Sequence, residues 1–276
     1  MCKRSETISD AISRHKYKLL SRFNLKTYTL DDIEKILRDA GINEGDCIML
    51  HASWRAFSGF ESSPEELILL LLRIIGDDGT LLMPCNGSHK DNFFDVKNSP
   101  NYSGVISQVF MKMEGVKRSV GGHFSVCAYG KLRDELLDEH INSIYGFDDS
   151  SPYGKFSQLE SKVLFMGLGK KPTKISLFHR VGYVLRKEEY FKSIFSEHKK
   201  VLVIDENNNS VEKSILNRVG FKNCSKNIRK IFDSIPASSR FYSKIGLLDI
   251  VLLDTQESLR TAFLCAKNGV YMYKKK

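Results

Sequence analysis

The spacing of apolar residues along the chain switches repeatedly between the period of a buried strand and that of an amphipathic helix. Short apolar runs predict strands at residues 46–51, 80–83, 125–129, 162–168, 201–205 and 246–253. Stripes at helical spacing predict helices at residues 5–22, 30–40, 64–75, 104–115, 131–139, 211–219, 224–233 and 255–267. Strands and helices that alternate in this way predict an α/β fold built on a central sheet.

Two local signals sharpen these boundaries. Ser63 precedes Pro64 and two acidic residues, which is the usual chemistry of a helix start, and Gly76 follows the last apolar position of that helix. The polar run at residues 205–210 is typical of a turn or a hairpin tip.

A chain of 276 residues, 42% of them hydrophobic, can bury a substantial core and predicts one large domain with an appendage. We expect an amino-terminal helical extension at 1–26 and the main domain at 27–276. No apolar stretch reaches the roughly 18 residues of a membrane span, and the first residues lack the apolar core of a signal peptide. The six cysteines form no CxxC pair, which suits a reducing compartment. These features predict a cytoplasmic protein that needs no metal and contacts no membrane.

Positive charge is concentrated toward the carboxyl end of the chain. The net charge is +9, and residues 180–276 hold 19 Lys and Arg against 10 Asp and Glu, whereas residues 27–179 hold 16 against 21. Basic residues near a cleft attract phosphorylated ligands, although charge of this kind is also typical of a solvated surface. No zinc-finger, RNA-recognition or KH motif accompanies the charge. We therefore expect no nucleic-acid partner, and a non-catalytic basic binding module stays an alternative.

The strongest chemical signal is a buried strand that leads through a glycine turn to a histidine, within residues 162–180. Gly167 and Gly169 permit a sharp turn or the close approach of a ligand. His179 follows, and imidazole is the usual general base at neutral pH. Taken alone, a packed histidine with a structural hydrogen bond is the commoner interpretation. P-loop, nucleophile-elbow and HExxH motifs are absent from the sequence, which argues against the enzymes that they define.

Six segments, in order, resemble the antibiotic acetyltransferase family, which is typified by aminoglycoside 3-N-acetyltransferases. They are AGINEGDCIMLHASWRAFSG (40–59), GDDGTLLMPC (76–85), FFDVKNSPNYSG (93–104), GVKRSVGGHFSVCAYG (115–130), SSPYGKF (150–156) and KVLFMGLGKKPTKISLFH (162–179). The stretch 241–253 resembles the family's final strand region. The resemblance implies a central mixed sheet flanked by helices.

The resemblance also implies acetyl-coenzyme A as the acetyl donor and an amine as the acceptor. His179 matches the family's catalytic histidine, and direct transfer needs a base because an amine attacks only when it is neutral. The turn after the strand at 46–51 would bind the cofactor and offer backbone N–H groups to the developing oxyanion. The residues implied for catalysis and cofactor binding are His179, Ser53, His51, Ala52, Trp54, Arg118, Ser119 and Val120, and those for acceptor binding are Asp95, Asn86 and Tyr153. Structural alternatives remain for three of them: a helix cap at Ser53, a surface ion pair at Arg118 and a turn cap at Asp95.

The sequence departs from the family pattern close to these residues. Many members have Asn-Thr before the histidine, Glu three residues after it, and His-Pro after the Arg-Ser pair; these places hold Ile175, Ser176, Gly182, Gly121 and Gly122. The lost carboxylate and the basic carboxy-terminal third favour an anionic acceptor over a polycation. We therefore predict a nucleotide-linked amino sugar, as in surface-polysaccharide precursor synthesis, as the acceptor, with an aminoglycoside as the alternative. We expect a monomer or a homodimer, and the residue that orients His179 is not identifiable from one chain.

Overall fold

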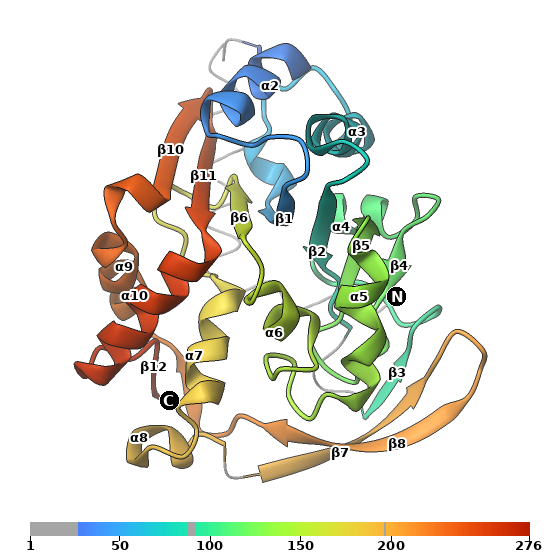
Figure 1. Ribbon diagram of the computed structural model, residues 1–276, viewed down its shortest axis with the longest axis vertical. Coiled ribbons are helices and arrows are strands. Elements are labelled where there is room, and N and C mark those ends of the chain that lie inside the picture. The colour runs from blue at the N-terminus through green and yellow to red at the C-terminus, as the bar shows by residue number, and fades with distance from the viewer. Residues whose placement is uncertain (1–26, 88–91, 196) are drawn as a thin grey trace.

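The computed structural model describes residues 27–87, 92–195 and 197–276, and its centre is a seven-stranded sheet (Figure 1). In the order in which they lie side by side, the strands are β10 (Arg240–Ile245), β11 (Leu248–Asp254), β6 (Ser161–Met166), β1 (Cys47–Ala52), β2 (Thr80–Pro84), β5 (Val126–Gly130) and β4 (Lys117–Arg118). β1 pairs parallel with β2 and β6, whereas the other neighbours pair antiparallel. The predicted α/β fold with a central mixed sheet is therefore confirmed.

Helices cover both faces of the sheet, because alternate residues of each central strand enter two different cores. Met49 of β1 lies in one core, and its neighbours Ile48 and Leu50 lie in the other. The core of Ile48 is closed by α2 (Leu30–Asp39), α3 (Pro64–Ile75) and α4 (Val105–Phe110). The core of Met49 is closed by α5 (Arg133–Leu137), α6 (Pro152–Phe156), α7 (His179–Val184), α9 (Ser225–Ser234) and α10 (Thr255–Lys267).

Two small sheets accompany the central one. β3 (Phe93–Asp95), β7 (Glu197–Ile204) and β8 (Ser210–Asn217) form a three-stranded sheet, and β9 (Phe221–Asn223) pairs with β12 (Tyr273–Lys275). The long β7–β8 hairpin runs along one side of the molecule (Figure 1). The remaining short helices are α8 (Glu189–Lys192) and the 3-10 helices η1 (Trp54–Ala56), η2 (Asp138–Asn142), η3 (Ser176–Phe178) and η4 (Ala237–Ser239).

The helix predicted at 211–219 is wrong, because residues 210–217 form β8. The apolar residues Val211, Ile215 and Leu216 recur at a helical spacing, but the predicted turn at 205–210 folds the segment back onto β7 in an eight-residue antiparallel ladder. That pairing satisfies the backbone of β8 and buries Lys213 and Ile215 on one side. The helices predicted at 104–115 and 131–139 are shorter than expected, and the second continues as η2.

The helix boundaries read from the sequence are confirmed at α3. The Ser63 hydroxyl accepts a hydrogen bond from the Glu66 amide, and the Glu66 carboxylate accepts one from the Ser63 amide. Gly76 ends the helix at a positive φ of 64°, a conformation that favours glycine. The helix predicted at 5–22, and with it the extension at 1–26, lies outside the described residues. Within the described ranges no helix combines the length and the apolar character needed to cross a bilayer.

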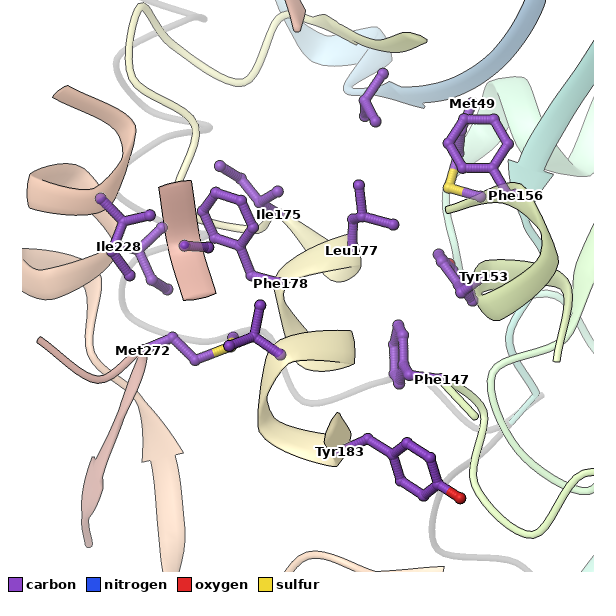
Figure 2. Close-up of a cluster of buried hydrophobic side chains, with 14 of the residues drawn as sticks. Met49, Phe147, Tyr153, Phe156, Ile175, Leu177, Phe178, Tyr183, Ile228 and Met272 are labelled. Carbon is purple, nitrogen blue, oxygen red and sulfur yellow. The ribbon is translucent and has the colours of Figure 1, made fainter. Parts of the chain in front are cut away.

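Helix α7 lies within the core of Met49, which also contains side chains from the carboxy-terminal part of the chain. Figure 2 shows Phe178 on the side of this helix that faces Ile228 and Met272, and Phe147 and Tyr153 on the opposite side. Helix α7 is therefore packed between two groups of buried apolar side chains.

Candidate functional site

The glycine turn after β6 lies against the turn after β1, as neighbouring parallel strands require. Gly167 has a φ of 75°, and a Cβ at this position would come within 2.8 Å of the Ser53 carbonyl oxygen and 2.5 Å of the Ala56 side chain. The Ser53 amide donates to the Met166 carbonyl at 2.9 Å. Only glycine permits this approach of the two turns.

His179 is the first residue of α7 and is 7% exposed. Its Nδ1 lies 2.6 Å from the Tyr273 hydroxyl and 3.0 Å from an Nη of Arg218. Its ring stacks on that of Tyr273 at 5.5 Å and contacts that of Phe147 at 5.0 Å. The sequence did not reveal Tyr273 and Arg218, because they lie 94 and 39 residues further along the chain.

Gly182, which stands where many family members have Glu, is packed against the same tyrosine. A Cβ on Gly182 would lie 2.8 Å from the Tyr273 ring and 3.2 Å from its hydroxyl. The ring of Tyr273 therefore fills the space in which a side chain at position 182 would begin. This absence of a side chain was the one sequence signal that a distant group lies beside His179.

The end of β1 and the turn after it hold four of the predicted residues. His51 is buried, its ring stacks on Phe165 at 5.2 Å, and burial lowers its pKa to about 4. It is therefore neutral at neutral pH, and its Nε2 has no hydrogen-bond partner among the described residues. Ser53 occupies the N-cap position of η1, yet its hydroxyl makes no capping hydrogen bond there. Ala52 ends β1, and Trp54 stacks on Phe57 at 4.9 Å.

Arg118 is buried and holds backbone carbonyls rather than a surface acid. Its guanidinium donates to the carbonyl oxygens of Cys85 at 2.9 Å and Ser99 at 2.6 Å, and it lies 4.7 Å above the Phe94 ring. The Arg118 side chain thereby ties the loop after β3 to the end of β2.

The two residues after Arg118 are also engaged in the structure. The Ser119 hydroxyl accepts from the Val126 amide at 2.9 Å and pairs with His140 Nδ1 at 2.8 Å. Val120 packs against the small core between β3 and β7.

The three residues predicted for acceptor binding differ in what holds them. The carboxylate of Asp95 accepts from the Asn98 side chain and from the amides of Asn98 and Lys97, so it caps its own turn, and these bonds lower its pKa. The Asn86 side-chain oxygen is buried and has no partner among the described residues. Tyr153 is fully buried against Phe147, and burial raises its pKa.

Aromatic rings join these groups into one region. Phe147 contacts both Tyr153 and His179. Phe124, which belongs to the segment that begins at Arg118, lies 4.6 Å from Phe147 and 6.2 Å from His179. The segment 118–124 therefore leads from the Arg118 contacts to the histidine. No group of three or more His, Cys, Asp or Glu within the described residues could hold a metal ion.

This fold is shared with solved acetyltransferases. The chain matches AAC-IIIb in its binary complex with CoASH at a TM-score of 0.74 and 18% identity, over 88% of this chain and 98% of that one. It matches AAC-VIa bound to sisomicin at a TM-score of 0.73 and 17% identity, over 88% and 99% of the two chains. The architecture is therefore that of the aminoglycoside acetyltransferases.

Sequence comparison reaches the same class. The family described as Aminoglycoside 3-N-acetyltransferase matches residues 49–264, and the chain belongs to this family. Aminoglycoside N(3)-acetyltransferase IV of Salmonella sp is 30% identical over 135 residues, 48% of this chain and 51% of that protein. The aminoglycoside N(3')-acetyltransferase-like protein YokD of Bacillus subtilis (strain 168) is 24% identical over 163 residues, 50% and 60% of the two chains. The matched segment thus spans about half the length of the first of these relatives.

The predicted nucleotide-linked amino sugar is wrong. The relatives are named for aminoglycosides, and solved neighbours hold gentamicin, apramycin or sisomicin. Both arguments for an anionic acceptor also fail on the structure. The glycine at position 182 is explained by the packing of Tyr273, and many of the basic residues of the last third are exposed on outer elements, among them Lys200, Lys222, Lys226, Arg229, Lys230 and Lys274.

Proposed function

We propose that this protein transfers the acetyl group of acetyl-coenzyme A to an amino group of an aminoglycoside. Family membership and the names of its relatives support the reaction and the acceptor class. The observation that carries the proposal is the position of His179. The resemblance to the family assigns it as the catalytic histidine, and it follows the β6 turn that packs against Ser53.

The reaction moves one proton along with the acetyl group. The neutral amine attacks the thioester carbonyl, a C–N bond forms, the C–S bond breaks, and coenzyme A leaves while the amine nitrogen loses a proton. A buried imidazole beside the reacting atoms can act on this step either through a lone pair or through an N–H group. Which ring nitrogen carries the proton is set by the hydrogen bonds made to the other one.

Buried polar atoms without partners support a binding site around the β1 turn and the Arg118 segment. Four belong to predicted site residues, and none of them has a hydrogen-bond partner among the described residues: His51 Nε2, the Asn86 side-chain oxygen, Arg118 Nε and the Tyr153 hydroxyl. An unpaired buried polar group costs about 1–3 kcal/mol, and such groups call for a partner that the protein alone does not supply. We assign these residues and Ser53 to the coenzyme and acceptor.

The test is acetyl transfer by the full-length chain, followed as the release of free thiol from acetyl-coenzyme A with gentamicin, apramycin and sisomicin as acceptors. We expect turnover with at least one of these aminoglycosides. His179→Ala should lower kcat by about 10²- to 10⁴-fold while calorimetry shows coenzyme binding close to that of the parent. A folded parent protein that binds coenzyme but acetylates none of the acceptors would contradict the proposal.

A second variant separates the coenzyme site from the chemistry. Arg118→Lys keeps the positive charge but loses the planar fork that holds two carbonyls. We expect weaker coenzyme binding by calorimetry, because the loop at 96–100 loses its anchor. An unchanged affinity would remove Arg118 from the coenzyme site.

A further inference from the structure

Two hydrogen-bond donors converge on one nitrogen of His179. The Tyr273 hydroxyl lies 2.6 Å from Nδ1, and Arg218 Nη1 lies 3.0 Å from the same atom. A guanidinium group can only donate. Nδ1 therefore accepts, and a neutral imidazole that accepts at Nδ1 carries its proton on Nε2.

The local structure fixes both donors. Tyr273 is buried in β12, where it pairs with Asn223 of β9, and its backbone carbonyl accepts from the Tyr190 hydroxyl at 2.7 Å. Arg218 directly follows β8, lies 4.9 Å above the Tyr273 ring and donates to the Asn223 side chain at 3.4 Å. β12 thus aims one hydroxyl at Nδ1, and the link between β8 and β9 aims one cation at the same atom.

Position 182 allows this arrangement. A Cβ there would lie 2.8 Å from the Tyr273 ring, so a side chain on α7 at this position and Tyr273 at its observed position exclude each other. A carboxylate on α7 would accept a hydrogen bond from an Nδ1–H group and leave a lone pair on Nε2, which is the form of a general base. A hydroxyl and a guanidinium that donate to Nδ1 have the opposite effect: they occupy the lone pair of Nδ1 and leave the proton on Nε2.

We propose that Tyr273 and Arg218 are positioning residues that keep the proton of His179 on Nε2, so that His179 donates a hydrogen bond to the oxyanion of the tetrahedral intermediate. This assignment rests on the proposed function. The amine attacks as the free base, its proton passes to solvent after attack, the C–S bond breaks, and the thiolate takes a proton from solvent. His179 remains neutral throughout.

The first test reads the tautomer directly and needs no substrate. In NMR spectra of protein labelled with ¹⁵N-histidine, the resonances of the two ring nitrogens of His179 are assigned because they disappear in His179→Gln. We expect the Nε2–H form near pH 7.5. Tyr273→Phe, which removes only the hydroxyl, and Arg218→Gln should each shift the Nδ1 resonance. Tyr271→Phe, a matched change in the ring that stacks on Tyr190 at 3.6 Å, should not. An Nδ1–H form or an imidazolium in the parent protein overturns the proposal.

The second test uses the amide of glutamine, whose nitrogen can donate much as Nε2 does but cannot accept a proton. A donor role predicts that His179→Gln keeps a kcat at least about tenfold above that of His179→Ala, since one oxyanion donor contributes about 10²- to 10³-fold. Tyr273→Phe should lower kcat with little change in KM. Equal loss in the Gln and Ala variants shows that His179 acts as a base and overturns the proposal. Absence of any aminoglycoside turnover would overturn the proposed function and leave the tautomer result standing.

Discussion

Two glycines that depart from the family pattern each make room for a ring from a distant part of the chain. Gly182 lies against Tyr273, and a Cβ on Gly121 would come within 2.3 Å of the His140 ring. His140 is buried and paired with Ser119. The sequence reveals that a side chain is missing at both positions, but the group that takes its place depends on the tertiary structure. The missing acid at position 182 was therefore interpreted as a sign of a different acceptor. In the structure it reflects a different neighbour of His179, the ring of Tyr273.

Gly121→Ala should be strongly destabilising. The new methyl group collides with a buried ring, and overpacking of this kind costs about 1–3 kcal/mol. Urea unfolding should show a lower midpoint at an unchanged slope. In a His140→Ala background, which removes the ring, the same substitution should cost much less. Equal costs in the two backgrounds would mean that the His140 ring does not restrict position 121.

At the scale of elements, the sequence predicts the strands that are buried on both faces of the sheet and misses strands that are partly exposed. β1, β2 and β6 are continuous apolar runs in the middle of the sheet, and all three were predicted within about two residues. β10 lies at the edge with alternating partly exposed residues and was missed. β8 was assigned to a helix because a few apolar residues fit either period. Its identity depends on pairing with β7, which a local pattern does not contain.

The capping box of α3 gives a prediction at the same scale. Ser63→Ala removes the hydroxyl that accepts from the Glu66 amide at 3.1 Å and should lower the unfolding free energy by about 1 kcal/mol. Ser225→Ala is the matched control, because Ser225 is exposed and begins α9 without occupying its cap position. We expect less than about 0.5 kcal/mol there, as for most surface changes. Similar losses in both variants would argue against a capping contribution at Ser63.

For the whole molecule, net charge was a poor guide to the ligand. The excess of Lys and Arg after residue 180 is real, but composition does not say where charges lie. Lys226, Arg229 and Lys230 are exposed on α9, whereas Arg218 is half-buried and lies beside His179. The two turns could be predicted because they follow the buried strands β1 and β6, and His179 could be predicted because it comes soon after the β6 turn along the chain. Tyr273 on β12 and Arg218 in the link between β8 and β9 complete the site from far along the chain, and they could not be predicted.

Buried neutral histidines should make the stability of the whole molecule sensitive to mild acid. Burial lowers the pKa of His51 to about 4, and burial together with the nearby Lys213 lowers that of His140 to about 3, against about 6.5 in an unfolded chain. Above pH 6.5 neither state binds the protons and the stability is complete. As the pH falls below 6.5 the unfolded state binds them first, so stability is lost. The slope is up to about 1.4 kcal/mol per pH unit for each histidine.

The check is the unfolding free energy measured in urea from pH 7.5 to pH 4.5, a range in which the histidines dominate the change. His51→Phe keeps a ring to stack on Phe165 and removes the titrating group, so its stability should fall about half as steeply as that of the parent. His198→Gln changes an exposed histidine and should follow the parent curve. If His51→Phe follows the parent curve as well, His51 becomes protonated in the folded protein at a pH close to that of the unfolded chain, and the ring is not sealed from solvent as the structure describes it.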